Sequence, residues 1–208
     1  MKKGTKVFVA ALALVLVFGA VVGGTLAWLQ STSKTITNTF TVGNVSIALN
    51  ESGLAEDETE KDFKMIPGNK IAKDPQITVN SGSEACWLFV EVTESDNLGT
   101  YIDYDIADGW TELSAGVYYR EVADLTADEA EDVIINVLAS DDTMVDDTKP
   151  YANGYVTVKG TVTAADMTAA ESDAPELTFT AYAVQKANVA SAADACSIAK
   201  TGDLPAQG

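Results

Sequence analysis

Apolar and polar residues alternate with a period of two over much of the chain, and the pattern begins near residue 35. Over residues 35–42 three of the four even positions carry apolar side chains and the odd positions carry threonines, which predicts a half-buried strand. After Gly43 the apolar side chains move to the odd positions, so we predict a bulge or tight turn there between two strand pieces. The first apolar face consists of Ile36, Phe40 and Val42, and the second of Val45, Ile47 and Leu49.

Further strands are predicted along the rest of the chain. The run from Cys86 to Val92 is apolar on both faces, which indicates a central strand covered on both sides. Residues 187–196 are rich in alanine and predict one short helix. Other alternating segments are 76–80, 117–122, 155–162 and 177–184, with a strand expected in "VIINVLAS" after Thr126 and Glu129.

These segments amount to eight to ten short strands with no alternation of strands and helices. We therefore predict an all-β fold, an antiparallel β-sandwich that is jelly-roll-like, with short helical and loop insertions. An immunoglobulin-like sandwich is the alternative connectivity.

The first residues have the pattern of an export signal. Three lysines at positions 2, 3 and 6 precede an apolar run from Val7 to Val22. Thr25, Leu26 and Ala27 form a small-x-small site, so cleavage is expected between Ala27 and Trp28; an uncleaved membrane anchor is the alternative. The expected organisation is a signal peptide (1–27), an amino-terminal segment (28–42), a β-sandwich domain (43–198) and a loose tail (199–208).

Composition and charge narrow the classes of partner. The chain has 208 residues, of which 47% are hydrophobic and 21% charged, enough apolar content for one core. Cleavage removes three of 13 basic residues and none of 31 acidic residues, so the formal net charge changes from −18 to −21. Such a chain repels phosphate backbones and anionic lipid, which argues against nucleic acid and direct lipid adhesion. Bridging between acidic surfaces by divalent cations is compatible with this negative net charge.

The two cysteines allow two interpretations. Cys86 and Cys196 are far apart and form no C-x-x-C pair, which argues against a zinc ribbon or a thioredoxin-like motif. In a secreted chain they could form one disulfide. Two separate free thiols are the other interpretation.

The absence of histidine limits catalysis. Without histidine the chain cannot form a Ser-His-Asp catalytic triad, a Cys-His catalytic dyad or an H-E-x-x-H zinc site. No catalytic residue, cofactor-binding residue, metal ligand or cofactor is therefore predicted, and we expect no enzyme. A hydrolase that uses two carboxylates is a remaining hypothesis, since 31 acidic residues give close pairs by chance.

Two acidic loops contain candidate calcium ligands, but a cluster of acidic residues is a sequence signal of low specificity. Neither has the D-x-[DN]-x-[DN]-G spacing of a calcium loop, so solvated loops are the favoured interpretation. The first loop contains Asp57, Glu58, Glu60 and Asp62, and the second contains Asp141, Asp142, Asp146 and Asp147.

Three stretches resemble a known family. "GGTLAWLQSTSKTITNTFTVGNVSIAL" (residues 23–49) has a glycine pair, T-x-A-[WY], N-T-F-x-x-G and an alternating strand. "IPGNKIAKDPQITVNSGSEACWLFVEV" and "TFTAYAVQKANVASAADA" continue the similarity, whereas residues 95–150 do not align by eye. Together they resemble the TasA/camelysin (CalY-like) family of Gram-positive biofilm matrix proteins.

The resemblance implies a secreted jelly-roll subunit that is processed by a SipW-type signal peptidase and has no stable membrane span after cleavage. It implies extracellular fibres, head-to-tail homopolymers in which the amino-terminal segment of one subunit adds as a strand to the next, with an anchoring or assembly protein as a further partner. Camelysin relatives have been classed as zinc metalloproteases, and the lack of histidine departs from that label.

Strand donation also has a physical basis that does not depend on the family. An open sheet edge binds an extended segment through main-chain hydrogen bonds, while alternate side chains fill pockets. The expected pocket-filling residues are Trp28, Leu29, Ile36, Phe40 and Val42, with Gly43 as the hinge. The competing hypothesis is a secreted monomeric adhesion module that presents aromatic loops containing Tyr101, Tyr104 and Trp110.

Overall fold

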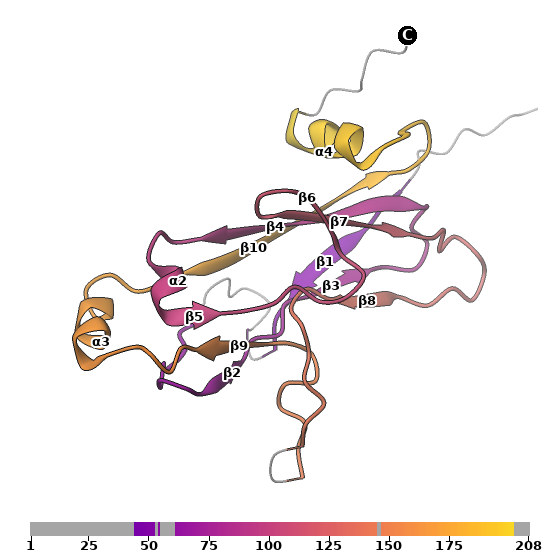
Figure 1. Cartoon of the computed structure of the whole chain (residues 1–208). Coiled ribbons are helices and arrows are strands. Elements are labelled where there is room, and N and C mark those ends of the chain that lie inside the picture. The colour runs from indigo at the N-terminus through magenta and orange to yellow at the C-terminus, as the bar shows by residue number, and fades with distance from the viewer. Residues whose placement is uncertain (1–43, 53, 55–60, 145–146, 202–208) are drawn as a thin grey trace, which may run out of the picture. The chain divides into compact units, whose positions relative to one another are not determined.

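The computed structural model describes residues 44–52, 54, 61–144 and 147–201. The chain divides into two compact units, Met1–Thr41 and Val42–Gly208, and every described residue belongs to the second. This second unit is built of antiparallel strands with three short helices among its described residues (Figure 1). The all-β, sandwich-like prediction with short helical insertions is confirmed.

The described strands form three antiparallel sheets. The β1 sheet has the order β1 (Ile47–Asn50), β3 (Gln76–Val79), β8 (Val133–Asn136). The β4 sheet has the order β10 (Leu177–Gln185), β4 (Cys86–Glu94), β7 (Val117–Val122), β6 (Thr111–Ser114). The β2 sheet has the order β2 (Lys70–Ala72), β9 (Tyr155–Val158), β5 (Ile102–Asp103).

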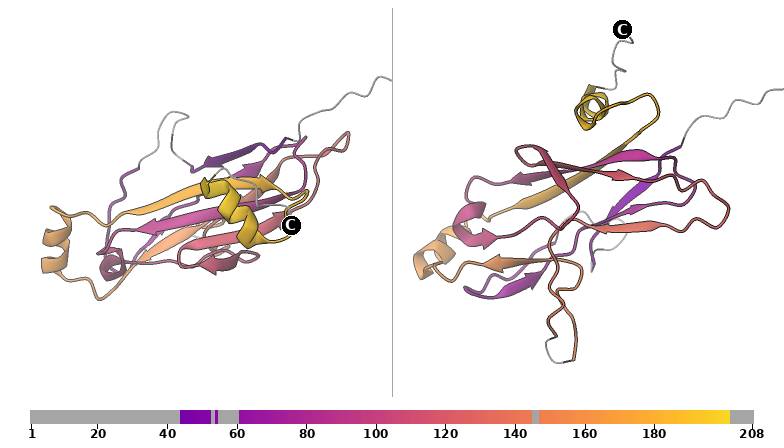
Figure 2. Two further views of the ribbon diagram at one scale, coloured as in Figure 1. Left: turned by 90° about the horizontal axis from the view of Figure 1, so that it is seen from above. Right: turned by 45° about the vertical axis from the view of Figure 1, so that its right-hand side comes forward.

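The β1 and β2 sheets follow one another along the same layer. Three residues join β2 to β3, and Lys73 N–H donates to the Gly154 carbonyl within this junction. An isolated bridge between Ile106 and Leu138 connects the segment after β5 to the segment after β8. The right-hand view of Figure 2 shows this layer below the β4 sheet, so the domain has two layers.

The main core lies between the β4 sheet and the β1 sheet. Successive side chains of a strand point to opposite faces, and the even-numbered residues of β4 point into this core. The central position predicted for the Cys86–Val92 run is confirmed, because β4 lies between β10 and β7. The buried residues of this core are Ile77, Val79, Cys86, Leu88, Val90, Val92, Val122, Ile135 and Val137.

A second cluster covers the outer face of the β4 sheet. Trp87 and Phe89, the odd-numbered apolar residues of β4, pack there beneath α4 (Ala192–Thr201). The Trp87 indole N–H donates to the Val189 carbonyl at 3.1 Å, and the Phe89 ring stacks on Tyr182 with centroids 5.1 Å apart. This helix explains why β4 is apolar on both faces.

Helix α4 corrects two boundaries. It begins after Ser191, whose hydroxyl accepts the Asp194 N–H at 3.1 Å, rather than at the predicted residue 187. It also continues to Thr201, so residues 199–201 are helical and the expectation of a loose tail from 199 is wrong for them. Residues 202–208 lie outside the described part.

The other helices lie at the end of the domain where β2, β9 and β5 pair. Helix α2 (Leu98–Tyr101) is one turn, and α3 (Ala164–Ala170) follows Thr163. Thr163 and Asp166 form a reciprocal capping box, which satisfies two N–H groups at the helix start. The strand predicted over 155–162 therefore ends at Val158, and the helix after it was not predicted.

Candidate functional site

Strand β10 is an edge strand, with no strand on its outer side among the described residues. Ser95 N–H donates to the Glu176 carbonyl at 3.0 Å just before the strand. Lys186 N–H donates to the Ala85 carbonyl at 2.8 Å just after it, on the same register with β4. Because opposed residues in antiparallel strands alternate between bonded and non-bonded pairs, the even-numbered residues of β10 bond to β4.

The odd-numbered residues of β10 consequently direct their N–H and C=O groups to the free side. These residues are Leu177, Phe179, Ala181, Ala183 and Gln185. All but Gln185 carry apolar side chains, which are half-buried and pack against the main core. The edge thus combines unpaired main-chain groups with an inward row of apolar side chains.

Strand β1 is the matching edge of the other layer. Asn80 N–H donates to the Ser46 carbonyl at 2.9 Å on the register of β1 with β3. By the same alternation Ile47 and Leu49 turn their main-chain groups outward. Ile47 is half-buried against the core, and Leu49 is 37% exposed, one of the most exposed large apolar side chains in the described part.

The two edges lie on the same side of the sandwich, and we call the strip formed by β1 and β10 the open flank (Figure 1). Cα atoms of the two strands approach within 8 Å. A strand hydrogen-bonded on both sides needs neighbours about 9.6 Å apart. An added strand could therefore form main-chain hydrogen bonds with only one of the two edges and would cover the other with its side chains. Strand β10 offers the longer edge, since it has nine residues and β1 has four.

The opposite flank is closed by the chain itself. The segment from Tyr104 to Trp110 packs against the main core between β8 and β7. Ala107 N–H donates to the Val137 carbonyl at 2.9 Å, and the Trp110 indole N–H donates to the Asn136 carbonyl at 2.9 Å. The Arg120 guanidinium lies 5.7 Å from the centroid of the Trp110 ring.

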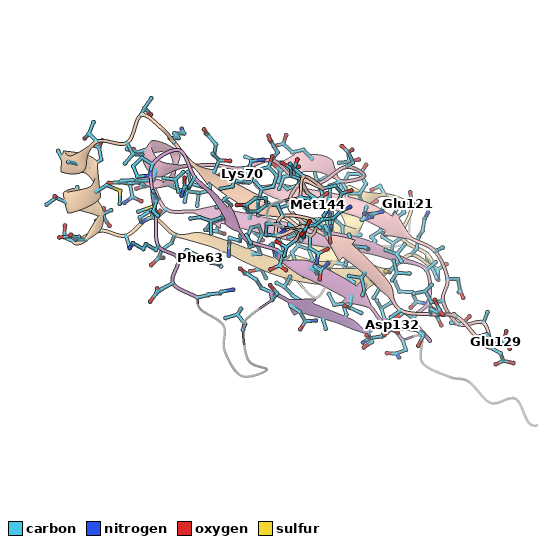
Figure 3. All side chains as sticks on the ribbon, turned by 90° about the horizontal axis from the view of Figure 1, so that it is seen from below. Phe63, Lys70, Glu121, Glu129, Asp132 and Met144 are labelled. Atoms are coloured by element: carbon cyan, nitrogen blue, oxygen red, sulfur yellow. The ribbon has the colours of Figure 1, made fainter. Side chains whose placement is uncertain are left out.

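A buried ion pair lies at one end of the open flank. Glu51, the residue after β1, accepts a hydrogen bond from Lys73 at 2.9 Å, and the two side chains are only 10% and 13% exposed. The Lys73 ammonium lies 5.4 Å from the centroid of Phe179 on β10 and 5.3 Å from that of Phe63, which Figure 3 labels. The pair therefore joins the end of β1 to the inward row of β10.

This ion pair is incompletely satisfied. Glu51 Oε1 is buried and has no hydrogen-bond partner, as is the case for one other side-chain atom in the described part, Arg120 Nε. A buried acceptor without a partner costs about 1–3 kcal/mol, more when charged.

The residues predicted to donate a strand lie outside the described residues. This holds for the cleavage site, Ala27 and Trp28, and for the hinge, Gly43. It also holds for Leu29, Ile36, Phe40 and Val42. Among the described residues the structure shows two strands with unpaired outer edges, β1 and β10.

The two cysteines do not form the disulfide considered from the sequence. Both are free thiols. Cys86 points into the main core, whereas Cys196 packs on the outer face of the β4 sheet with its sulfur 3.6 Å from the Tyr182 hydroxyl. Because the two sulfurs lie on opposite faces of the β4 sheet, the structure favours the interpretation of two separate thiols. Burial raises the pKa of the Cys86 thiol to about 11.

The acidic loops are engaged by ordinary surface contacts where they are described. Asp141 accepts hydrogen bonds from Lys70 and Thr143, which hold its pKa well below the usual value, and Asp142 lies 3.9 Å from Lys149. Asp57, Glu58, Glu60 and Asp146 lie outside the described residues. No group of three or more Cys, Asp or Glu side chains suited to a metal ion occurs in the described ranges.

The aromatic residues expected to form an adhesive surface are mostly structural. Tyr101 is 4% exposed and donates to the Asp166 carbonyl at 3.0 Å. Tyr104 is half-buried and donates to Glu94; burial, followed by this hydrogen bond, raises the pKa of Tyr104 well above its usual value. Trp110 closes the flank described above. These contacts do not form the exposed aromatic cluster that an adhesion module requires.

An open cleft of about 460 Å³ lies between Glu94 and Tyr118 of the β4 sheet and the segment around Asp103 and Asp105. Its acids are already engaged in part, since Glu94 accepts from Tyr104 and Asp103 pairs with Lys159 at 3.1 Å.

Sequence reasoning missed Glu51, Lys73 and the outward groups of β10. Glu51 is not among the candidate residues of the sequence analysis, because it begins the acidic stretch that leads to Asp57. The available signal was its position, since it continues the odd-numbered row of Ile47 and Leu49.

The fold and the open flank define a class: an all-β antiparallel domain with an unpaired apolar edge on one side. No family model, curated protein or solved structure matches the chain. None of the helices in the described ranges is long and apolar enough to cross a membrane.

Proposed function

We propose that this protein is a secreted, non-enzymatic structural subunit that assembles into extracellular fibres by strand addition. The amino-terminal segment of one copy, residues 28–42, adds to the open flank of the next. The observation that carries the proposal is the outer edge of β10, where five residues present main-chain groups above an apolar row.

The lengths of the two elements agree. The alternating segment of residues 35–42 spans about 27 Å as a strand, and the nine residues of β10 span about 30 Å. Each main-chain hydrogen bond contributes about 0.5–1.5 kcal/mol net, and the inward side chains add apolar burial. The small Ala181 and Ala183 leave room beside them for large side chains such as Phe40.

The assembly is open-ended. The donated segment and the accepting edge are different surfaces of the same chain, so the contact is heterologous and extends into a filament unless the rotation closes a ring. The resemblance to the TasA/camelysin family supports the same assignment, with a SipW-type signal peptidase as the processing partner, the cell surface or matrix as the location, and an anchoring or assembly protein as a further partner.

The test compares two purified forms of the chain. One starts at Trp28 and the other starts at Thr41, which removes the donated segment but keeps the open flank. We expect fibres by negative-stain microscopy from the first form only, with both forms folded by circular dichroism. Fibres from both folded forms, or from neither, would contradict the proposal.

A further inference from the structure

One end of the sandwich holds the point where the amino-terminal segment is attached. Asn44 lies at this end, where its carbonyl accepts the Glu84 N–H at 2.9 Å. The loop of residues 123–132 lies at the same end, because Ser81 N–H donates to the Asp132 carboxylate at 2.7 Å. We call it the Asn44 end, and Figure 3 labels Asp132 there.

The opposite end of the sandwich, which we call the α3 end, consists of α2, α3 and the loop of residues 171–176 (Figure 1). Strand β10 begins there at Leu177. It runs to Gln185 at the Asn44 end, where Lys186 N–H donates to the Ala85 carbonyl at 2.8 Å. The open flank therefore reaches from one end of the domain to the other.

Both ends are acidic. The loop of residues 123–132 contains five acidic residues, the loop of residues 171–176 contains three, and neither loop contains a lysine or an arginine. All of these side chains are exposed, and none forms an ion pair with a described lysine or arginine. They are Asp124, Asp128, Glu129, Glu131 and Asp132 at the Asn44 end, and Glu171, Asp173 and Glu176 at the α3 end.

The direction of an added segment decides which ends of two copies meet. Residue 42 is followed by Gly43 and then by Asn44, so the donor's Asn44 end lies beside whichever end of the accepting flank residue 42 reaches. A segment parallel to β10 would bring two Asn44 ends together, at the point where the accepting copy's own segment is attached.

A segment antiparallel to β10 avoids this crowding. It places the donor's Asn44 end on the acceptor's α3 end and leaves the acceptor's own Asn44 end free for the next joint. The same step can then repeat along a filament. Antiparallel pairing is also slightly more stable per residue than parallel pairing.

We propose that the added segment runs antiparallel to β10, so that the acidic Asn44 end of one copy docks on the acidic α3 end of the next and ionic strength controls assembly. The inference rests on the proposed function and deepens it, because it names the second surface of the joint and its regulation. The Debye length is about 30 Å at 0.01 M salt and about 10 Å at 0.1 M, so added salt screens the repulsion between the two ends.

The experiment measures the critical concentration for fibre assembly of the chain that starts at Trp28, by sedimentation in the presence of a chelator. We expect the wild type to assemble at an about tenfold lower concentration in about 0.1 M than in about 0.01 M sodium chloride. The variant E171Q/D173N/E176Q removes the charges of the α3 end. It keeps the main-chain groups of that loop that bind Ser95 and Asn97. At the lower salt it should assemble at an about fivefold lower concentration than the wild type.

A matched control removes the same number of charges elsewhere. E112Q/D142N/D147N changes three exposed acids outside the loops of both ends, and its critical concentration should stay within about twofold of the wild type. The variant E171K/D173K/E176K makes the α3 end basic, so its critical concentration should rise with salt instead of falling. Thermal unfolding establishes that each variant is folded.

Three results would overturn the docking of the two ends. The first is an equal effect of E171Q/D173N/E176Q and the control, and the second is an unchanged direction of the salt dependence in E171K/D173K/E176K. The third is an effect of D128N/E129Q/E131Q at the Asn44 end with none at the α3 end, which parallel addition predicts. These results leave the proposed function intact provided that the form starting at Thr41 makes no fibres. A wild-type chain that makes no fibres at either salt concentration overturns both.

Discussion

Trp110 donates its indole N–H to the carbonyl oxygen of Asn136 at 2.9 Å, and this contact closes one flank of the sandwich. The flank formed by β1 and β10 has no equivalent contact in the described part of the chain. The difference between the two flanks underlies our proposal that the second accepts a strand from another copy.

Replacing Trp110 by phenylalanine should destabilise the domain by about 1–3 kcal/mol. The reason is that the Asn136 carbonyl loses its donor and part of the ring burial is lost. Urea unfolding measures the change. I134T on β8, the strand of Asn136, is the control, because Ile134 is 64% exposed and its substitution should stay within about 0.5 kcal/mol. Equal effects of the two substitutions would contradict the closing role of Trp110.

Replacing Ala181 by proline should block fibre assembly while costing the free subunit only about 1 kcal/mol. The Ala181 N–H points to the free side of β10, so proline removes no bond to β4 but obstructs an added strand. Sedimentation measures assembly and thermal unfolding measures stability. T180P is the comparison, because the Thr180 N–H bonds to β4 and its loss should destabilise the subunit much more. A fibre-forming A181P chain would exclude β10 as the accepting edge.

Replacing Gly116 by alanine should destabilise the domain by about 2 kcal/mol or more. Gly116 has φ +73°, and a Cβ there would lie 2.7 Å from the Val92 carbonyl oxygen, whose strand cannot move aside in the sheet. Gly99 has no atom within 4 Å of such a Cβ, so G99A should change stability by about 1 kcal/mol or less. Chemical denaturation of both variants measures the difference in stability. A G116A variant as stable as the wild type would contradict the prediction.

The two thiols should react at different rates in the folded chain. Cys86 is fully buried and its pKa is raised to about 11 by burial, so little thiolate forms at pH 8. Cys196 is half-buried on the outer face of the β4 sheet. Labelling with a chromogenic disulfide should modify Cys196 first and Cys86 only in denaturant. An intact mass lower by the two hydrogens of a disulfide would contradict the two free thiols.

The contact between Lys70 and Asp141 should contribute to stability above about pH 4 and lose its contribution in acid. Hydrogen bonds from Lys70 and Thr143 lower the pKa of Asp141 in the folded state, so the contribution is complete above the unfolded pKa, about 3.9. It is lost as the pH falls through the lower native pKa. Urea midpoints between pH 2 and 7 should therefore fall less steeply in acid for D141N than for the wild type. Parallel curves would contradict the assignment.

Strand positions followed from the sequence where the environment of a strand is regular. The alternation at 177–184 identified β10, and the two-sided apolar run at 86–92 identified β4 as central. Helix boundaries were less accurate. The Ser191–Asp194 pair is a capping signal that marks the start of α4 at Ala192, but the alanine-rich composition placed that start at residue 187. Thr163 and Asp166 are the same kind of signal for α3, directly after the stretch 155–162 that was interpreted as strand.

The sequence by itself determined that this is an all-β chain with a period-2 amino-terminal segment, because alternation along a strand is a local property. Only the tertiary structure decided that β1 and β10 keep unpaired edges, since edge status depends on which distant strands become neighbours. It also decided that Glu51 meets Lys73 beside Phe179 with one oxygen unpartnered. These residues are far apart in sequence, and only the packing of the two layers sets the distances between them.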